Sequence, residues 1–286
     1  MTLRFSYGTN GFTDHRLPDV LAILAELGYE GVALTLDHQH LDPFAPGLAA
    51  RVSQTAGLLE RHGLAVAVET GARYVLDPWR KHEPTFVSAE RREERADLVR
   101  RAVDIAVDLG GDVVHLWSGV LPAGTSPEVG WERLVSGLAP VVEHAEAAGV
   151  RLAFEPEPGM FVDRLAGVEE LRSRLGSPAA LQATLDVGHA LVTESADPHE
   201  LIRTHAGIVA HIQIEDMKRG VHEHLEFGEG DVDVPATLAA LVDIGYTGLV
   251  SVELSRHSHA APAVAERSLA VLRAALDTVT SHRVRS

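Results

Sequence analysis

Residues Ala147–Phe154, AAGVRLAF, show the pattern that decides the fold. Gly149 stands just past the end of an expected helix, where glycine adopts the left-handed conformation that ends the last turn, and a short apolar run follows it. The pattern recurs at 26–32 (ELGYEGV), 61–68 (RHGLAVAV), 108–114 (DLGGDVV) and 243–250 (DIGYTGLV). Apolar runs without alternation indicate strands that are buried on both faces, as in a parallel sheet.

From these joins outward, the whole chain alternates strands with helices. Strands are predicted at Leu3–Tyr7, Gly31–Leu36, Ala65–Glu69, Asp112–Trp117, Arg151–Glu155, Gln182–Asp186, Val209–Glu215 and Leu249–Leu254. Helices are predicted at Pro18–Leu27, Gly47–Arg61, Ala89–Leu109, Gly130–Ala148, Leu165–Leu175, Pro198–Thr204, Val234–Ile244 and Pro262–Leu276. Consecutive strand–helix units predict an α/β fold, a (β/α)8 TIM barrel that forms a single domain over residues 1–286. A doubly wound sheet is the alternative, but no GxGxxG turn follows the first strand.

The composition limits the kinds of site that the chain can build. It has 286 residues, no cysteine and a formal net charge of −16. Without thiolates, any metal must be held by oxygen and imidazole nitrogen, which suits Mn, Zn, Mg, Co or Fe. The negative charge opposes attraction to nucleic acid or an anionic membrane, so we expect neither as a partner. The first residues lack the apolar core of a signal peptide, and we expect a cytoplasmic protein.

Metal-type side chains stand at the carboxyl ends of the predicted strands, where TIM barrels place their chemistry. These positions hold Glu69, His115, Glu155, Asp186 with His189, His211 and Glu253, and the loop after the seventh strand adds His222 and His224. Each has a structural alternative, because an acid such as Asp186 can cap a helix and a histidine can be a core or solvated group. Together they favour a metal centre, since buried charges without partners are costly and a divalent cation removes that cost.

Five motifs follow one another in the second half of the chain. They are FEPEP at 154–158, LDVGH at 185–189, AHIQIED at 210–216, HEHLEFGEGDVD at 222–233 and SVEL at 251–254. This set resembles the xylose isomerase-like TIM-barrel superfamily, which holds sugar phosphate isomerases and epimerases and, more distantly, apurinic endonucleases. The resemblance implies that one divalent metal is coordinated by Glu155, Asp186, His211 and Glu253. His189 would then lie beside the metal and hold a substrate hydroxyl or a second metal.

The chemistry that such a site can perform leads to the first functional hypothesis. A divalent metal that binds a hydroxy-ketone polarises the carbonyl and acidifies the neighbouring C–H group. Glu155 and Glu253, on opposite sides of the site, would remove and return that proton. Return to the other face epimerises the carbon, and return to the adjacent carbon isomerises an aldose to a ketose. We therefore expect a metal-dependent isomerase or epimerase of a sugar or sugar-like polyol.

The number of ligands supports a second hypothesis, because His115, His222 and His224 exceed what one ion needs. Two or three ions would activate water, as in a hydrolase or phosphoesterase that acts on a small molecule and is related to apurinic endonucleases. A third alternative is a barrel that binds a sugar or metal without catalysis. A count of metal ions per chain separates the first two hypotheses.

The remaining polar and aromatic side chains near the strand ends are predicted to contact the substrate. We expect these contacts from His189, Glu157, Lys218, Arg256, His257 and Trp117. The polar connection Tyr74–Ser88 is predicted to fold over the mouth of the barrel. The resemblance also allows a homo-oligomer, since relatives often form dimers or tetramers.

Overall fold

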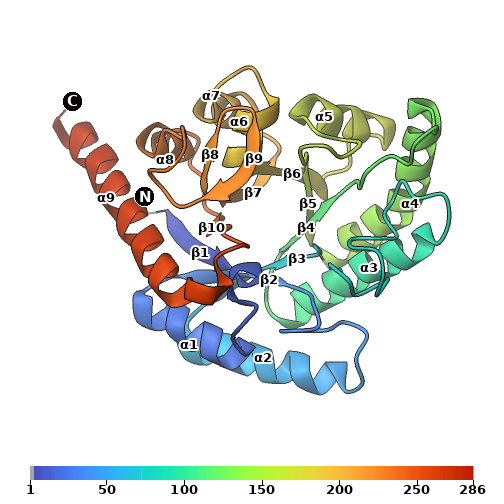
Figure 1. The fold of residues 1–286 in the computed structure, drawn as a ribbon, viewed down its shortest axis with the longest axis horizontal. Coiled ribbons are helices and arrows are strands. Elements are labelled where there is room, and N and C mark those ends of the chain that lie inside the picture. Colours follow the sequence, from blue (N-terminus) through green and yellow to red (C-terminus); the bar gives the residue numbers. More distant parts are fainter. Residues whose placement is uncertain (1–2, 72, 286) are drawn as a thin grey trace.

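The protein forms a closed barrel of parallel strands, in the order β1-β10-β7-β6-β5-β4-β3-β2 (Figure 1). The structure is a computed structural model that describes residues 3–71 and 73–285. The barrel strands are β1 (Arg4–Gly8), β2 (Gly31–Thr35), β3 (Ala65–Glu69), β4 (Val113–Trp117), β5 (Arg151–Glu155), β6 (Leu181–Asp186), β7 (Val209–Ile214) and β10 (Leu249–Val252). The predicted TIM barrel is therefore confirmed, with the ends of the strands shifted by at most a few residues.

Helices surround the barrel on its outside (Figure 1). They are α1 (Leu17–Leu27), α2 (Leu48–His62), α3 (Arg92–Asp108), α4 (Pro127–Ala148), α5 (Leu165–Arg174), α6 (Val187–Thr193), α7 (Pro198–Thr204), α8 (Val234–Asp243) and α9 (Ala261–Arg285), with short 3-10 turns at Thr9–Phe12 and Ser258–Ala260. Strand residues such as Val32 and Val68 and helix residues such as Leu21 and Val99 are completely buried between the two layers. Burial of this apolar layer is the main source of stability for the fold.

The glycines of the helix–strand joins have the predicted backbone conformation. Gly28 ends α1 with a φ of 93°, and its N–H group donates to the carbonyl oxygens of Leu24 and Ala25. Gly149 ends α4 in the same way, with a φ of 71°. A side chain would strain both positions, so these glycines turn the chain sharply back into the next strand.

The hairpin after β7 and the short helix after β6 were not predicted. The segment after β7 is an antiparallel hairpin of β8 (Asp216–Lys218) and β9 (Val221–Leu225), where a loop was expected. The short helix α6 begins directly after β6, and the Asp186 carboxylate caps it by accepting the N–H of His189 at 2.6 Å. β8 has only three residues, and α6 begins without a loop after β6, so neither has clear boundaries in the sequence.

The centre of the barrel is polar. The Ser6 and Ser251 hydroxyls form a hydrogen bond of 2.6 Å. The buried carboxylate of Glu69 accepts hydrogen bonds from Thr35 at 2.9 Å and from Gln213 at 3.1 Å. Polar side chains thus continue from the middle of the barrel to its mouth, where the site lies. Within the described residues, no helix combines the length and the apolar character that crossing a membrane requires.

Candidate metal centre

Three carboxylates from different strands meet at the mouth of the barrel. Glu155 ends β5, Asp186 ends β6 and Glu253 follows β10. Each offers one oxygen, and these three oxygens all lie within 4.8 Å of one another. Parallel strands of a barrel end at one rim, which is why residues so far apart in sequence converge. The structure therefore brings together three of the four carboxylate and imidazole ligands that the sequence predicts for one ion.

One oxygen of each carboxylate contacts a neighbouring residue. Oε2 of Glu155 lies 2.7 Å from Nε2 of His115, and Oε1 of Glu253 accepts a hydrogen bond of 2.8 Å from the Asn10 amide. Oδ1 of Asp186 accepts the N–H of His189. The other oxygen of Asp186 is buried and lacks a hydrogen-bond partner among the described residues, and Oε1 of Glu155 lies 2.9 Å from Nδ1 of His189. Buried oxygens without a partner are costly, and a bound cation would satisfy them.

The pKa values of the buried acids indicate that negative charge is in excess. Burial and the nearby carboxylates of Glu69 and Glu155 raise the pKa of Glu253 well above its usual range. Burial works in the same direction on Glu155, but the imidazoles of His115 and His189 outweigh it and lower the pKa of that carboxyl. Hard oxygen donors that share excess negative charge suit a divalent cation. The donor set thus fits the metal that was expected here.

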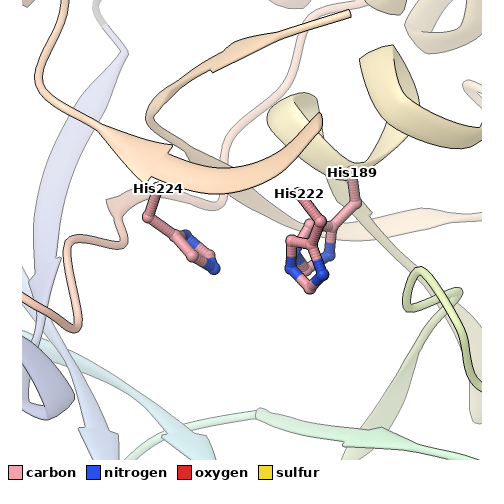
Figure 2. Close-up of side chains that lie close together, drawn as sticks. All are labelled: His189, His222 and His224. Carbon is pink, nitrogen blue, oxygen red and sulfur yellow. The ribbon is translucent and has the colours of Figure 1, made fainter. Parts of the chain in front are cut away.

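Three imidazoles form a second group beside the carboxylates. His189 comes from α6, and His222 and His224 come from β9 (Figure 2). Nε2 of His189 lies 3.0 Å from Nε2 of His222, and ligand atoms of all three rings lie within 4.8 Å of one another. The two groups are adjacent, because ligand atoms of Glu155, Glu157 and His189 also lie within 4.8 Å of one another. Burial and the Glu155 charge raise the pKa of Glu157 to about 8.

The Asp216 carboxylate fixes the hairpin that carries two of these imidazoles. Its oxygens accept the backbone N–H groups of Gly228, Gly230 and Val232 at 2.8 to 3.0 Å. Asp216 follows β7 by two residues, so these bonds close the hairpin at its base. They hold β9 where His222 and His224 face the carboxylates.

His211 lies deeper in the barrel than the sequence predicts. A register shift between Ala183 and Thr184 pairs Thr184 with His211, so Gln213 is the residue level with Asp186. Nε2 of His211 lies 4.0 Å from the Glu69 carboxylate, and His211 belongs to none of the donor groups found among the described residues. The structure therefore does not bring His211 to the other predicted ligands. Gln213 stands at their level instead, and its buried Oε1 lacks a hydrogen-bond partner among the described residues.

Glu215 is a further acid of the site that we did not predict as a ligand. Its side chain is completely buried, and neither oxygen has a hydrogen-bond partner among the described residues. Oε1 lies 4.0 Å from Nδ1 of His224 and packs against Gly188, where a Cβ atom would stand only 2.1 Å from it. The signal was in the sequence, because alternation along a strand places Glu215 on the same face as Gln213.

The carboxylates open into a pocket of about 210 Å³. Of the predicted substrate contacts, Glu157, Arg256 and Trp117 line it. Lys218, His257 and His189 are not among its lining residues; Lys218 is exposed on β8, and His189 is buried behind the ring of His222. The lining also includes residues that we did not predict, from the first turn after β1 and from the connection between β3 and α3: Asn10, Arg73, Lys81 and His82.

Comparisons with known proteins give consistent results. The family described as xylose isomerase-like TIM barrel matches residues 21–275. The chain is 27% identical to 2-oxo-tetronate isomerase of Cupriavidus necator, over 85% of this chain and 88% of that protein. It is 26% identical to L-ribulose 3-epimerase of Mesorhizobium japonicum, over 83% of this chain and 75% of that protein. A solved structure of an L-ribulose 3-epimerase has the same fold, with a TM-score of 0.78, 22% identity and coverage of 99% of this chain and 97% of the other.

Proposed function

The chain belongs to the xylose isomerase-like TIM-barrel family, and we propose that it is a divalent-metal-dependent isomerase or epimerase of a sugar or sugar-like polyol. Its relatives include sugar isomerases and epimerases. The observation that carries the proposal is the carboxylate group of Glu155, Asp186 and Glu253, whose oxygens lie within 4.8 Å of one another and include a buried Asp186 oxygen without a hydrogen-bond partner among the described residues. A site of this kind is expensive to build unless it holds a cation.

The residues that would hold Mn, Zn, Mg, Co or Fe are these three carboxylates and Gln213, the side chain level with Asp186. His211, the ligand that the resemblance suggested, lies one layer below. When bound, a divalent ion polarises a substrate carbonyl and makes the adjoining C–H group more acidic.

The protein's own groups then move the proton. Glu155 and Glu253 come from β5 and β10, which β6 and β7 separate around the barrel, so they approach a bound substrate from different sides. One carboxylate takes the proton and the other returns a proton to the opposite face, or to the adjacent carbon. His115 and Asn10 keep the two carboxylates in place. His189, which the family resemblance suggested would hold a substrate hydroxyl, lies behind His222 and does not line the pocket, so we assign it no substrate contact.

Hydrogen exchange with solvent tests the proposal. We expect ketoses incubated in D2O with the metal-loaded protein to gain deuterium at the carbon beside the carbonyl. Glu155→Gln and Glu253→Gln should each lose this exchange and remain folded by circular dichroism. Glu223→Gln is a matched control, because Glu223 is exposed on the hairpin. Full exchange in either site variant, or none with any ketose in the wild-type protein, contradicts the proposal.

The three-histidine group supports a second candidate function, a hydrolase or phosphoesterase with two or three ions. Imidazole nitrogens suit Zn, Co or Fe, and the group lies directly beside the carboxylates. A count of metal per chain by elemental analysis separates the two functions. One ion, unchanged in His222→Asn, favours the isomerase. Two or three ions, one of them lost in His222→Asn, together with release of phosphate from a small phosphoester, favours the hydrolase.

A further inference from the structure

The pocket lining contains both acidic and basic side chains. The acids are Glu69, Glu155, Glu157 and Glu253, and the basic residues are Arg73, Lys81 and Arg256. Arg256 lies 3.6 Å from the exposed Glu223 carboxylate. Arg73 and Lys81, in contrast, have no carboxylate within 4.0 Å among the described residues. This is unusual in a chain with 41 acids and 25 basic residues, where a cation is more easily paired than left free.

The same connection contains arginines that are paired. Arg80 and Arg91 both bind the Asp77 carboxylate, with distances of 2.9 Å and 3.4 Å, and neither lines the pocket. The connection thus neutralises basic groups away from the pocket and leaves two of them without a carboxylate partner where they line it; the Arg73 guanidinium donates to the neutral carbonyl oxygen of Asn10 at 3.4 Å. That difference points to a ligand with negative charge.

A buried arginine fixes the shape of this connection. The Arg95 guanidinium donates hydrogen bonds to the carbonyl oxygens of Thr70, His82 and Pro84, at 3.0, 2.5 and 2.9 Å. The N–H of His82 also donates to the carbonyl oxygen of Arg73. These bonds fold the segment back on itself, so that Arg73 comes next to the Lys81–His82 pair at the mouth.

Three positive charges act on the imidazole of His82. Burial lowers the pKa of His82 to about 4, and the charges of Lys81, Arg95 and Arg73 add to the effect. Lys81, Arg95 and Arg73 thus place positive charge near His82, although the protein as a whole carries a formal net charge of −16. Like charges that converge without a counter-ion favour the binding of an anion.

We propose that Arg73 and Lys81 form an anion subsite, and that the substrate of this enzyme is an anionic sugar derivative. The subsite holds a carboxylate or phosphate group at one end, while the reacting carbonyl lies at the metal-binding carboxylates. A guanidinium binds such a group through two parallel hydrogen bonds, and the ammonium adds a charge. The pocket of about 210 Å³ suits a small sugar acid or sugar phosphate. The assignment of the substrate rests on the proposed function, but the anion subsite does not.

Calorimetry with matched ligands tests the subsite. The ligands are D-erythronate, D-erythrose 4-phosphate and the neutral polyol erythritol, titrated into the wild-type protein with Mn²⁺ present. We expect at least one anion to bind about tenfold or more tightly than erythritol, as charge-assisted hydrogen bonds allow. The stronger of the two anions identifies the carboxylate or the phosphate as the natural group.

Variants of Arg73 and Lys81 test whether these residues cause the preference for the anion. Arg73→Gln and Lys81→Gln should each reduce the preference for the anion, and the double variant should abolish it without loss of thermal stability. Arg80→Gln is the matched control, since Arg80 belongs to the same connection but lies outside the pocket lining. Equal affinity for all three ligands overturns the subsite. A preference that survives in the double variant also overturns it, because the anion is then held by the metal.

The outcomes for the subsite and for the proposed function are distinguishable. Deuterium exchange into neutral ketoses without any anion preference supports the isomerase and refutes the subsite. An anion preference that depends on Arg73 and Lys81, in a protein without exchange activity, supports the subsite and refutes the isomerase.

Discussion

Nε2 of His115 lies 2.7 Å from Oε2 of Glu155, and both side chains are buried in the barrel. The imidazole thus fixes the direction of a carboxylate whose other oxygen, Oε1, lies 2.9 Å from Nδ1 of His189. We expect His115→Asn to lower turnover or metal affinity about 10–100-fold, as is usual when the partner of a ligand is lost. Steady-state kinetics at several metal concentrations measures both effects. His144→Asn, which breaks an exposed pair with Asp104, is the control and should change neither.

Removal of metal should destabilise the protein. The carboxylates of Glu155, Asp186 and Glu253 repel one another when no cation separates them. At a metal concentration of about 100 times the dissociation constant, binding stabilises the folded state by about 2.7 kcal/mol. We expect chelation to lower the melting temperature and metal to restore it, whereas Asp186→Asn should respond weakly to either. A chelated protein with unchanged melting temperature and activity would refute the metal centre.

His211 and Gln213 of β7 lie at different depths in the barrel, so variants of these two residues can be compared directly. Gln213 is level with Asp186, and His211 lies below it beside Glu69. Gln213→Ala should therefore weaken metal binding more than His211→Asn does. Metal titration of both variants, followed by elemental analysis, gives the order. If His211→Asn loses the metal and Gln213→Ala keeps it, then His211 is the ligand, as the family resemblance implies, and Gln213 is not.

Acid should weaken the folded state through His82. Burial, helped by Lys81 and its neighbours, lowers the pKa of His82 in the folded protein from 6.5 to about 4. At pH values between these two, His82 binds a proton in the unfolded chain but not in the folded protein. Stability therefore falls as the pH drops from about 6.5 to 4. The loss is about 1.4 kcal/mol per pH unit at most. Melting temperatures of His82→Gln should depend less on pH in this window, and those of His259→Gln, an exposed control, should follow the wild type.

Arg95 should be important for stability as well as for the shape of the pocket. Its side chain is almost completely buried, and it donates to three carbonyl oxygens. Arg95→Met leaves those carbonyls without donors, and we expect a loss of about 2–4 kcal/mol in the free energy of unfolding. Denaturant unfolding measures the loss. Arg100→Met on the same helix, where the arginine is partly exposed, should cost far less.

Much of the fold could be predicted because its signal is local. A glycine such as Gly28 or Gly149 ends a helix through its own backbone conformation, and the apolar strand follows at once. The convergence of Glu155, Asp186 and Glu253 was also predictable, because the ends of parallel strands share one rim.

The level of a residue within the barrel was not predictable in the same way. The register shift at Ala183 and Thr184 moves His211 one layer below Asp186, and pairing between two strands leaves no mark in either sequence. Arg73 and Lys81 were missed for a related reason. Their connection has no periodicity, and its path depends in part on the distant Arg95.

The hairpin β8–β9 lies between β7 and α8, and the bonds from Asp216 close it at its base. The frame of the barrel supplies the oxygen donors, and this short insertion supplies two of the three imidazoles. If the proposed metal centre is correct, exchange of this insertion alone would remove two of the three imidazoles, leave the carboxylates in place, and so alter the cation capacity of an otherwise identical scaffold.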